Sequence, residues 1–316
     1  MASGEIANPF DAAAARYPAL GRLLQTVVDV WPEHRSFLEK SLEPRTEAVM
    51  RTSDRMAAAV LELTAGSERA HAENYRWLCD QIREEELNFA RTDRYRYSTF
   101  AETNANVYSN ADFMHRYMDG LLYSHVLWFM HLSSLHFFTQ RVGARVKDGG
   151  RVLEVGSGHG LLLYLCLSEL KMAEATAWDL SQVSLDQTKA ALHRLGALDR
   201  ARFVVQDMHK AEPGGEPFDL IILSHLLEHL EDPVDALKRL KPLVAKRGYL
   251  YVNVPLNAPM PDHLILLSTP AEAEQLIVDG GFRVLESSSH TTQGVTLSRA
   301  LKQRTAVTCS IIAEPA

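Results

Sequence analysis

The sequence predicts an α/β protein in which a doubly wound, mainly parallel sheet follows an all-α N-terminal domain. Up to about residue 147, apolar residues recur at spacings of three and four without strand-like alternation, which is typical of amphipathic helices. From residue 149, short β-branched or leucine-rich runs alternate with helical segments, which is typical of a parallel sheet. We therefore expect a helical N-terminal cap domain at residues 1–147 and a sheet domain at residues 148–316.

The chain has the composition of an ordinary globular protein. Its 316 residues are 46% hydrophobic and 23% charged, and this length allows one large domain with an appendage or two unequal domains. Thirty-three Lys and Arg residues against 40 Asp and Glu residues give a net charge of −7, so the surface repels a phosphate backbone. We therefore expect no nucleic-acid partner.

Cysteine usage and the first residues indicate a reducing compartment. Cys79, Cys166 and Cys309 are odd in number and far apart, so they form neither a disulfide framework nor a metal-binding pair. The first 20 residues contain no basic region followed by an apolar stretch, which a secretion signal requires. We expect a cytoplasmic protein.

The helical region contains three periodic stretches and one long apolar stretch. The periodic stretches are residues 9–30, 45–63 and 67–89. Residues 121–140 contain no Asp, Glu, Lys or Arg and reach the length of a membrane span. Because His125, His131 and His136 would be costly in lipid, we expect one buried helix here and no membrane contact.

The second part of the chain contains strand-like runs separated by helical segments. The expected strands are residues 151–155, 175–179, 201–206, 218–223, 248–254, 282–287 and 306–313. The expected helices are residues 160–170, 184–195, 232–243 and 270–279. In such a sheet, ligands bind at the edge formed by the carboxyl ends of the strands.

A glycine-rich turn follows the first of these strands. Gly156, Gly158 and Gly160 stand in the order G-x-G-x-G, and Leu161 replaces the third glycine of the dinucleotide-binding fingerprint. Glycine permits positive φ angles and a close approach of a ligand to the backbone. The turn therefore predicts a ligand site and disfavours a hydride-transfer cofactor, and a tight turn without a ligand is the alternative.

Carboxylates stand at or near the ends of three successive strands. Glu154 lies beside the glycines, Asp179 ends the second strand and Asp207 follows the third. Asp179 can accept hydrogen bonds from both hydroxyls of a ribose, and Asp207 can accept from an exocyclic amine while the N–H of Met208 donates to a ring nitrogen. Each carboxylate alone is also explained as a solvated strand end, but the three together indicate a nucleoside-containing ligand.

These motifs resemble those of the class I S-adenosylmethionine-dependent methyltransferases. The resemblance is carried by residues 153–160, Asp179, Asp207, residues 218–221 and residues 226–233, and it covers roughly residues 148–316. It implies a Rossmann-like sheet of seven strands whose last two form an antiparallel edge. It also implies S-adenosyl-L-methionine as the cofactor and S-adenosyl-L-homocysteine as the product, and it says nothing of the first 147 residues.

The resemblance further implies where each part of the cofactor binds. The glycine loop faces the methionyl part, Asp179 the ribose, and Asp207 the adenine, while Ser224 and His225 line the sulfonium end. The cofactor-binding residues are therefore expected to be Glu154, Gly156, Gly158, Gly160, Asp179, Leu180, Asp207, Met208 and Ser224.

Residues 225–229 also spell His-x-x-Glu-His, the order used by one class of zinc peptidases. His225 and His229 would share one helix face, with Glu228 beside them. A catalytic zinc also needs a third protein ligand, and no downstream acid stands out as one. We therefore expect no metal, and a zinc hydrolase is a less favoured alternative.

Four residues are candidates for a catalytic role. Methyl transfer is an in-line displacement that needs a base only where the nucleophile loses a proton. His225 and His229 follow the fourth strand, and His263 lies in a proline-rich loop after the fifth. Tyr117 belongs to an aromatic belt before the apolar stretch, and such a belt stabilises a cationic sulfonium or ammonium. For His229, His263 and the aromatic belt, a purely structural role is the competing explanation.

These features together predict a methyltransferase whose helical domain closes the site over a small polar metabolite. We favour an amino-acid-like acceptor methylated at N or S, including a methionine-type thioether, which needs a desolvated cage instead of a base. An O-methyltransferase of a phenolic metabolite is the alternative, and a non-catalytic cofactor-binding module is compatible with the same motifs. The helical domain also offers a surface for a possible homodimer.

Overall fold

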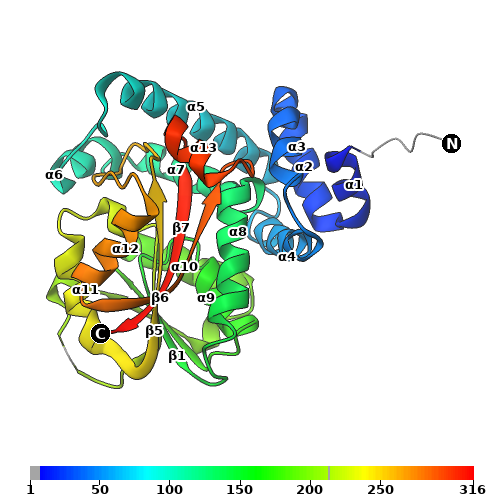
Figure 1. Ribbon diagram of the computed structural model, residues 1–316. Coiled ribbons are helices and arrows are strands. Elements are labelled where there is room, and N and C mark those ends of the chain that lie inside the picture. Colours follow the sequence, from blue (N-terminus) through cyan, green and yellow to red (C-terminus); the bar gives the residue numbers. More distant parts are fainter. Residues whose placement is uncertain (1–7, 213) are drawn as a thin grey trace.

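One mixed sheet of seven strands forms the centre of the computed structural model, which describes residues 8–212 and 214–316. The strand order is β3-β2-β1-β4-β5-β7-β6, and β7 runs antiparallel to both β5 and β6 (Figure 1). The strands are β1 (Arg151–Val155), β2 (Glu174–Asp179), β3 (Ala201–Val205), β4 (Phe218–Ser224), β5 (Val244–Leu256), β6 (Phe282–Thr291) and β7 (Val307–Pro315). The predicted fold class is confirmed, including the antiparallel edge pair.

The helices that join these strands lie close to the predicted positions. They are α9 (Leu161–Ser168), α10 (Gln182–Arg194), α11 (Pro233–Leu240), α12 (Pro270–Asp279) and α13 (Leu297–Gln303), with short 3-10 turns η4 (Leu198–Arg200), η5 (Met208–Lys210), η6 (Leu227–His229) and η7 (Lys241–Leu243). Helix α13, between β6 and β7, is not predicted by the sequence pattern. Strand β5 begins four residues earlier than expected.

Helices cover both faces of the sheet (Figure 1). Side chains of a strand alternate between the two faces. In β4, Leu220 and Ile222 therefore join the buried cluster under α9 and α10, whereas Ile221 and Leu223 join the cluster under α11 and α12. The sheet is thus buried on both sides, and its carboxyl edge is left to form a site.

The described residues of the N-terminal region form helices joined by turns and loops, without a strand. Its helices are α1 (Pro9–Arg16), α2 (Pro18–Val30), η1 (Pro32–His34), α3 (Arg35–Leu42), α4 (Glu47–Leu63), α5 (Glu68–Thr92), α6 (Phe100–Thr103), η2 (Asn104–Tyr108), α7 (Ala111–Leu127), α8 (Phe129–Phe137) and η3 (Phe138–Val142). The predicted stretch 9–30 divides at Tyr17 because Pro18 lacks the N–H that would continue the first helix.

The prediction of one continuous helix at residues 121–140 is wrong, although the segment is largely buried as expected. Helix α7 ends at Leu127 and α8 begins at Phe129, with Trp128 between them in an extended conformation (φ −91°, ψ 127°). The buried guanidinium of Arg45 donates to the carbonyls of Val126 and Leu127 at 2.9 and 3.1 Å. These bonds satisfy carbonyls at the end of α7 that lack a partner within the helix.

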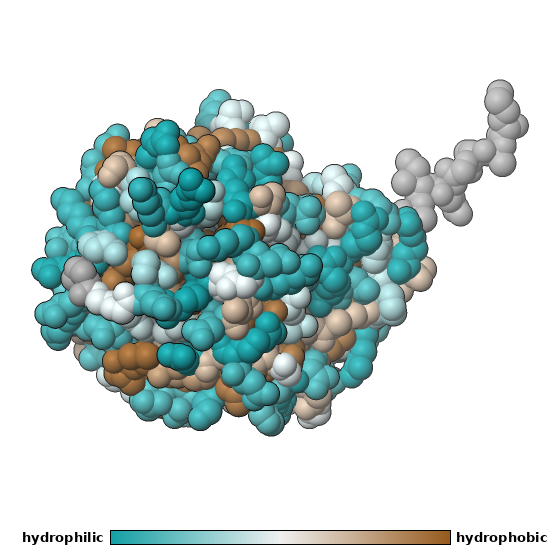
Figure 2. All heavy atoms as spheres, turned by 90° about the horizontal axis from the view of Figure 1, so that it is seen from below, coloured by the Kyte–Doolittle hydropathy of each residue, from teal (hydrophilic) through white to brown (hydrophobic). Residues whose placement is uncertain are grey.

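In the part of the chain that the structure describes, no helix combines the length and apolar character needed to cross a membrane. Figure 2 shows the face below the sheet of Figure 1, where hydrophilic side chains predominate and apolar ones stand in small groups. The three cysteines are unpaired, as expected.

The expected domain boundary at residues 147 and 148 lies between η3 and β1. One buried hydrophobic cluster nevertheless extends across it, from Phe10 of α1 to Val152 of β1 and Tyr251 of β5. The helical region therefore packs directly on the sheet. The division into two domains stays a prediction.

Candidate active site

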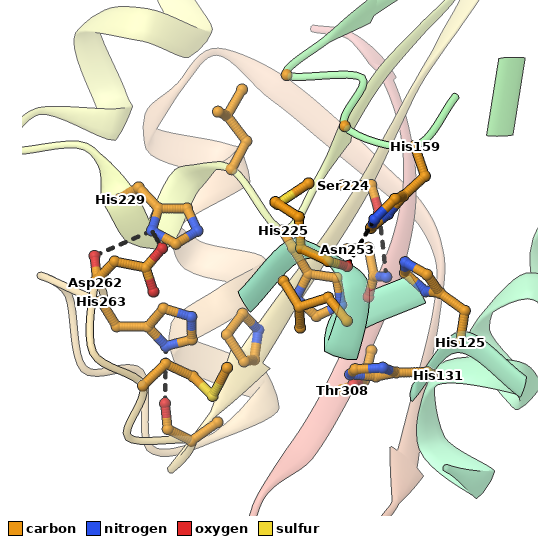
Figure 3. Close-up of a pocket in the computed structure, with 18 of the residues that line it drawn as sticks. His125, His131, His159, Ser224, His225, His229, Asn253, Asp262, His263 and Thr308 are labelled. Atoms are coloured by element: carbon orange, nitrogen blue, oxygen red, sulfur yellow. Dashed lines mark hydrogen bonds and ion pairs between the residues drawn. The ribbon is translucent and has the colours of Figure 1, made fainter. Parts of the chain in front are cut away.

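A cavity of about 320 Å³ lies at the carboxyl edge of the sheet, beneath helices α5, α7 and α8. Its walls include Glu154 of β1, Ser224 of β4 and Asn253 of β5 on the sheet side, and Tyr117 and His125 of α7 on the helical side. Figure 3 shows polar side chains entering it from opposite sides. This volume is within the range of small-molecule sites, which is about 300–1,000 Å³.

The glycine loop forms one wall of the cavity. Gly156 has φ +72° and Gly158 has φ +48°, both in the left-handed region that favours glycine. A Cβ at Gly156 would lie 3.0 Å from a side-chain carbon of Leu226, whereas at Gly158 the nearest atom would be 3.7 Å away, on Met118. The loop backbone is therefore open to a ligand at Gly158.

Glu154 carries a buried carboxylate without a full set of partners. The residue is 3% exposed and lines the cavity, and its Oε2 has no hydrogen-bond partner. Burial raises the pKa of this carboxyl group well above its ordinary value. An ammonium group in the cavity would supply both the missing hydrogen bond and the compensating charge.

Of the two aspartates predicted for the nucleoside part, Asp179 is the last residue of β2 and Asp207 lies two residues after the end of β3, and only one of them lines the cavity. Asp179 lines it, and its two carboxylate oxygens accept from the N–H of Ser181 at 2.8 Å and the hydroxyl of Ser184 at 2.7 Å. Asp207 lies further out, where Lys210 is 3.1 Å from its carboxylate. Partial burial raises the pKa of Asp207, but Lys210 and a backbone N–H outweigh this and leave that pKa lowered.

Of the other predicted cofactor residues, some line the cavity and some do not. Ser224 lines the cavity, whereas Gly160, Leu180 and Met208 do not belong to its walls. Gly160 stands at the start of α9, Leu180 is exposed and Met208 is buried in the core. Their assignment to the cofactor stays a prediction.

A buried hydrogen-bonded cluster forms the opposite end of the cavity. Asp262, only 4% exposed, accepts a hydrogen bond from the hydroxyl of Tyr117 at 2.8 Å and a longer one from Tyr108 at 3.4 Å. His229 Nδ1 lies 3.0 Å from the backbone carbonyl of Asp262 and 3.6 Å from its carboxylate (Figure 3). Because a carbonyl only accepts, Nδ1 carries the hydrogen and Nε2 is the ring nitrogen left to accept a proton.

The charges around this cluster set its protonation. Burial lowers the pKa of His229, but the carboxylates of Asp262 and Glu228 outweigh it, so that pKa is raised above 6.5. Burial, followed by the charge of Asp262, raises the pKa of Tyr117 well above 10. Tyr117 therefore stays protonated and acts as a hydrogen-bond donor.

The two remaining candidate bases have other contacts. His263 is buried and donates from Nδ1 to the carbonyl of Ala258 at 2.8 Å, and burial lowers its pKa to about 4. Its ring packs edge-on against that of His229, with centroids 5.0 Å apart. His225 lies 3.2 Å from the carboxylate of Glu228 through its Nδ1. All three histidines line the cavity.

The zinc-peptidase motif does not form the helix that its spacing suggests. His225 has a left-handed backbone (φ +50°) and residues Leu227–His229 form a 3-10 turn, so the two histidines do not share a helix face. Among the described residues, the side chains close enough to hold a metal ion are Glu228, His229 and His263, whose ligand atoms lie within 4.8 Å of one another. His225 does not belong to this group.

Asn253 and Thr308 line the cavity although sequence reasoning did not single them out, and it is also lined by Asp262, beside the predicted His263, and by Tyr108 of the predicted aromatic belt. None of them belongs to a motif with fixed spacing, and they come from β5, β7, the helical region and a loop. Of these residues, Asp262 could be connected with the site from the sequence because it is next to the predicted base His263.

The sheet order, the antiparallel strand β7 and the glycine loop at the end of β1 define a class I S-adenosylmethionine-dependent methyltransferase. A family model described as "Methyltransferase domain" matches residues 131–304, more than half of the chain. The chain belongs to this methyltransferase family, and its cofactor is S-adenosylmethionine. The predicted family and cofactor are confirmed.

Characterised relatives are distant. The chain is 27% identical over 135 residues to the ubiquinone biosynthesis O-methyltransferase of Vibrio campbellii, covering 42% of this chain and 54% of that protein. It is 27% identical over 136 residues to the trans-aconitate 2-methyltransferase of Variovorax paradoxus, covering 42% and 50%. The chain spans about half the length of these relatives. The solved structure of the mitomycin 7-O-methyltransferase MmcR is 15% identical, with a TM-score of 0.49 over 80% of this chain and 72% of that one.

Proposed function

We propose that this chain transfers a methyl group from S-adenosylmethionine to the hydroxyl oxygen of a small, uncharged phenolic acceptor. The observation that carries the proposal is a single cavity that joins the glycine loop to the His229–Asp262 pair. Such a cavity places a cofactor site and a candidate base within reach of one small molecule. We infer the substrate from this chemistry and not from the relatives, because the alignments cover only about half of each relative.

The cavity residues fit the cofactor. The unpartnered oxygen of buried Glu154 suits the methionyl ammonium, and the open backbone at Gly158 admits the methionyl chain. Asp179, at the end of β2, suits the ribose hydroxyls. When bound, S-adenosylmethionine supplies an electrophilic methyl group on a positively charged sulfur.

The lining favours an uncharged acceptor. Among the described residues that line the cavity, none is a lysine or an arginine, so a second carboxylate, in addition to that of the cofactor, would find no permanent cation there. Tyr108, Tyr117 and Trp128 instead offer aromatic surface. We therefore prefer the phenolic acceptor to the amino-acid-like acceptor that the sequence favoured. One of the relatives is a ubiquinone biosynthesis O-methyltransferase, and this agrees with the choice of an oxygen acceptor.

His229 provides the base that such an acceptor needs. A phenol loses its proton as its oxygen is methylated, and Nε2 of His229 accepts that proton. Asp262 holds the ring through Nδ1 and stabilises the imidazolium that results. Tyr117 fixes Asp262 from the helical side, and α7 and α8 exclude water from the cavity.

A screen of acceptors tests this proposal. Purified protein would be incubated with labelled S-adenosylmethionine and a panel of phenols, amino acids and thioethers, and the methylated products identified by mass spectrometry. We expect products in which a phenolic oxygen is methylated. We expect no product in which an amine or a thioether of methionine, histidine or tyrosine is methylated. Product confined to amino acids or thioethers would contradict the proposal.

A further inference from the structure

Two buried polar side chains on the sheet face under α8 line the cavity, and each has an oxygen without a hydrogen-bond partner. Asn253 is 6% exposed and Thr308 is 1% exposed, and both Asn253 Oδ1 and Thr308 Oγ1 have no partner. Leaving such atoms unsatisfied costs about 1–3 kcal/mol each, so a ligand that bonds to them gains affinity.

Ser310, the neighbour of Thr308 on this sheet face, does have hydrogen-bond partners. In the β5–β7 pair, Asn253 stands opposite Ser310, and Pro255 stands opposite Thr308, which places Ser310 and Thr308 two residues apart on one face. Ser310 reaches the hydroxyl of Ser134 on α8 at 2.8 Å. Among Asn253, Thr308 and Ser310, the oxygens without a partner are therefore those of the two residues that line the cavity.

His131 of α8 adds a third polar atom at this place. The hydroxyl of Ser124 donates to the carbonyl of Leu121 at 2.7 Å, so it accepts from His131 Nδ1 at 3.0 Å. The Nε2 atom of His131 is therefore an acceptor. Burial, with the nearby His225 and His125, lowers the pKa of this ring well below 6.5 and keeps it uncharged.

We propose that Asn253, Thr308 and His131 form a second subsite for the methyl acceptor, which binds a hydroxyl or amine group of that molecule as a hydrogen-bond donor. Figure 3 shows this group and the His229–Asp262 pair on opposite sides of the cavity. The acceptor is then a phenol that carries a second donor group away from the methylated oxygen. This inference rests on the proposed function, because it assumes that the acceptor occupies this cavity.

Binding of matched naphthols tests the subsite without requiring turnover. The protein, saturated with S-adenosylhomocysteine, would be titrated with 1-naphthol and with dihydroxynaphthalenes that carry the second hydroxyl on the other ring. We expect at least one dihydroxy compound to bind about tenfold more tightly than 1-naphthol, the effect of one or two hydrogen bonds. In Thr308→Val and Asn253→Leu this advantage should fall to about twofold or less, whereas Thr308→Ser should keep it.

Ser310→Ala is the control, because Ser310 lies on the same face outside the cavity walls and should keep the advantage. Cofactor binding should be equal in all variants. The subsite is contradicted if the wild type shows no preference, if the preference survives in both Thr308→Val and Asn253→Leu, or if these variants weaken cofactor binding as much as naphthol binding. If the protein binds a dihydroxynaphthalene more tightly than 1-naphthol but methylates no naphthol, the subsite is supported and the proposed phenol acceptor is contradicted.

Discussion

The hydroxyl of Tyr117, on a helix of the N-terminal region, donates a hydrogen bond of 2.8 Å to Asp262 on the loop after β5. The two residues are 145 positions apart in the chain, and both are buried. This bond joins the helical region to the candidate catalytic histidine, because Asp262 also holds His229. Under the proposed function, the helical region thus contributes to the chemistry as well as to the walls of the cavity.

Tyr117→Phe should lower kcat/KM by about 10- to 100-fold, because a hydrogen bond to a charged acceptor contributes roughly 1.5–3 kcal/mol. The loss should appear with cofactor affinity unchanged, since Tyr117 contacts Asp262 at the end of the cavity away from the glycine loop. Steady-state kinetics and calorimetric titration of the cofactor would measure the two effects. Tyr108→Phe is the matched control, and it should cost less because its hydroxyl lies 3.4 Å from Asp262. An equal loss in both variants would contradict the role of this bond.

The pH dependence should report His229. Its pKa is raised above 6.5 by Asp262 and Glu228 against the effect of burial, and only the uncharged ring accepts a proton. The kcat/KM should therefore be low at acidic pH and rise through a midpoint above 6.5.

Asp262→Asn should move this midpoint to lower pH, because it removes the charge that contributes most to raising the pKa. Asp235→Asn, at an exposed aspartate 3.1 Å from His209, should leave the midpoint in place. A midpoint that does not respond to Asp262→Asn would show that another group titrates. A rate independent of pH would favour a thioether acceptor.

Asp179→Ala should raise the dissociation constant of the cofactor by about 10- to 100-fold through the loss of hydrogen bonds to a charged acceptor. His229→Ala and His263→Ala should leave that constant within about twofold, because both lie at the acceptor end. Calorimetric titration with S-adenosylhomocysteine would measure all three. Asp186→Ala is the control, since Asp186 is an exposed residue of α10 bonded to Gln182. Loss of affinity in the histidine variants and not in Asp179→Ala would reverse the assignment.

Arg45→Leu should destabilise the fold by about 3 kcal/mol, because it leaves the buried carbonyl of Val126 without its donor and removes one of the two donors to the carbonyl of Leu127, the other being the hydroxyl of Ser41. Arg51→Leu removes an exposed ion pair with Glu47 and should cost less than about 1 kcal/mol. Chemical denaturation of both variants would compare them. Equal stability of the two would mean that the break at Trp128 does not depend on Arg45.

The sequence pattern predicted the sheet well because its strands are short apolar runs that end at turn residues, such as residues 151–155 before Gly156. It did not predict the break at Trp128, since the surrounding residues are largely apolar and Arg45, which stabilises the break, is 81 residues away from Val126, to which it donates. Local periodicity contains no information on such distant contacts.

The candidate site divides along the same line. Glu154, Gly156, Gly158, Asp179 and Ser224 follow from their positions at strand ends, and all of them line the cavity. The residues at the acceptor end come from separate parts of the chain, and tertiary packing brings them together. The sequence indicates His229 and His263 through their positions after strands. Only the fold shows that the loop after β5 holds the ring of His229.

The most direct test of the central claim is the rate of O-methylation of a phenolic acceptor by the wild type and by His229→Ala, both saturated with S-adenosylmethionine. Loss of a general base typically costs about 10²–10⁴-fold in rate. We predict a loss of this size in His229→Ala, with cofactor affinity unchanged and His263→Ala less affected. O-methylation by His229→Ala at the wild-type rate would contradict the claim that His229 accepts the proton of the acceptor.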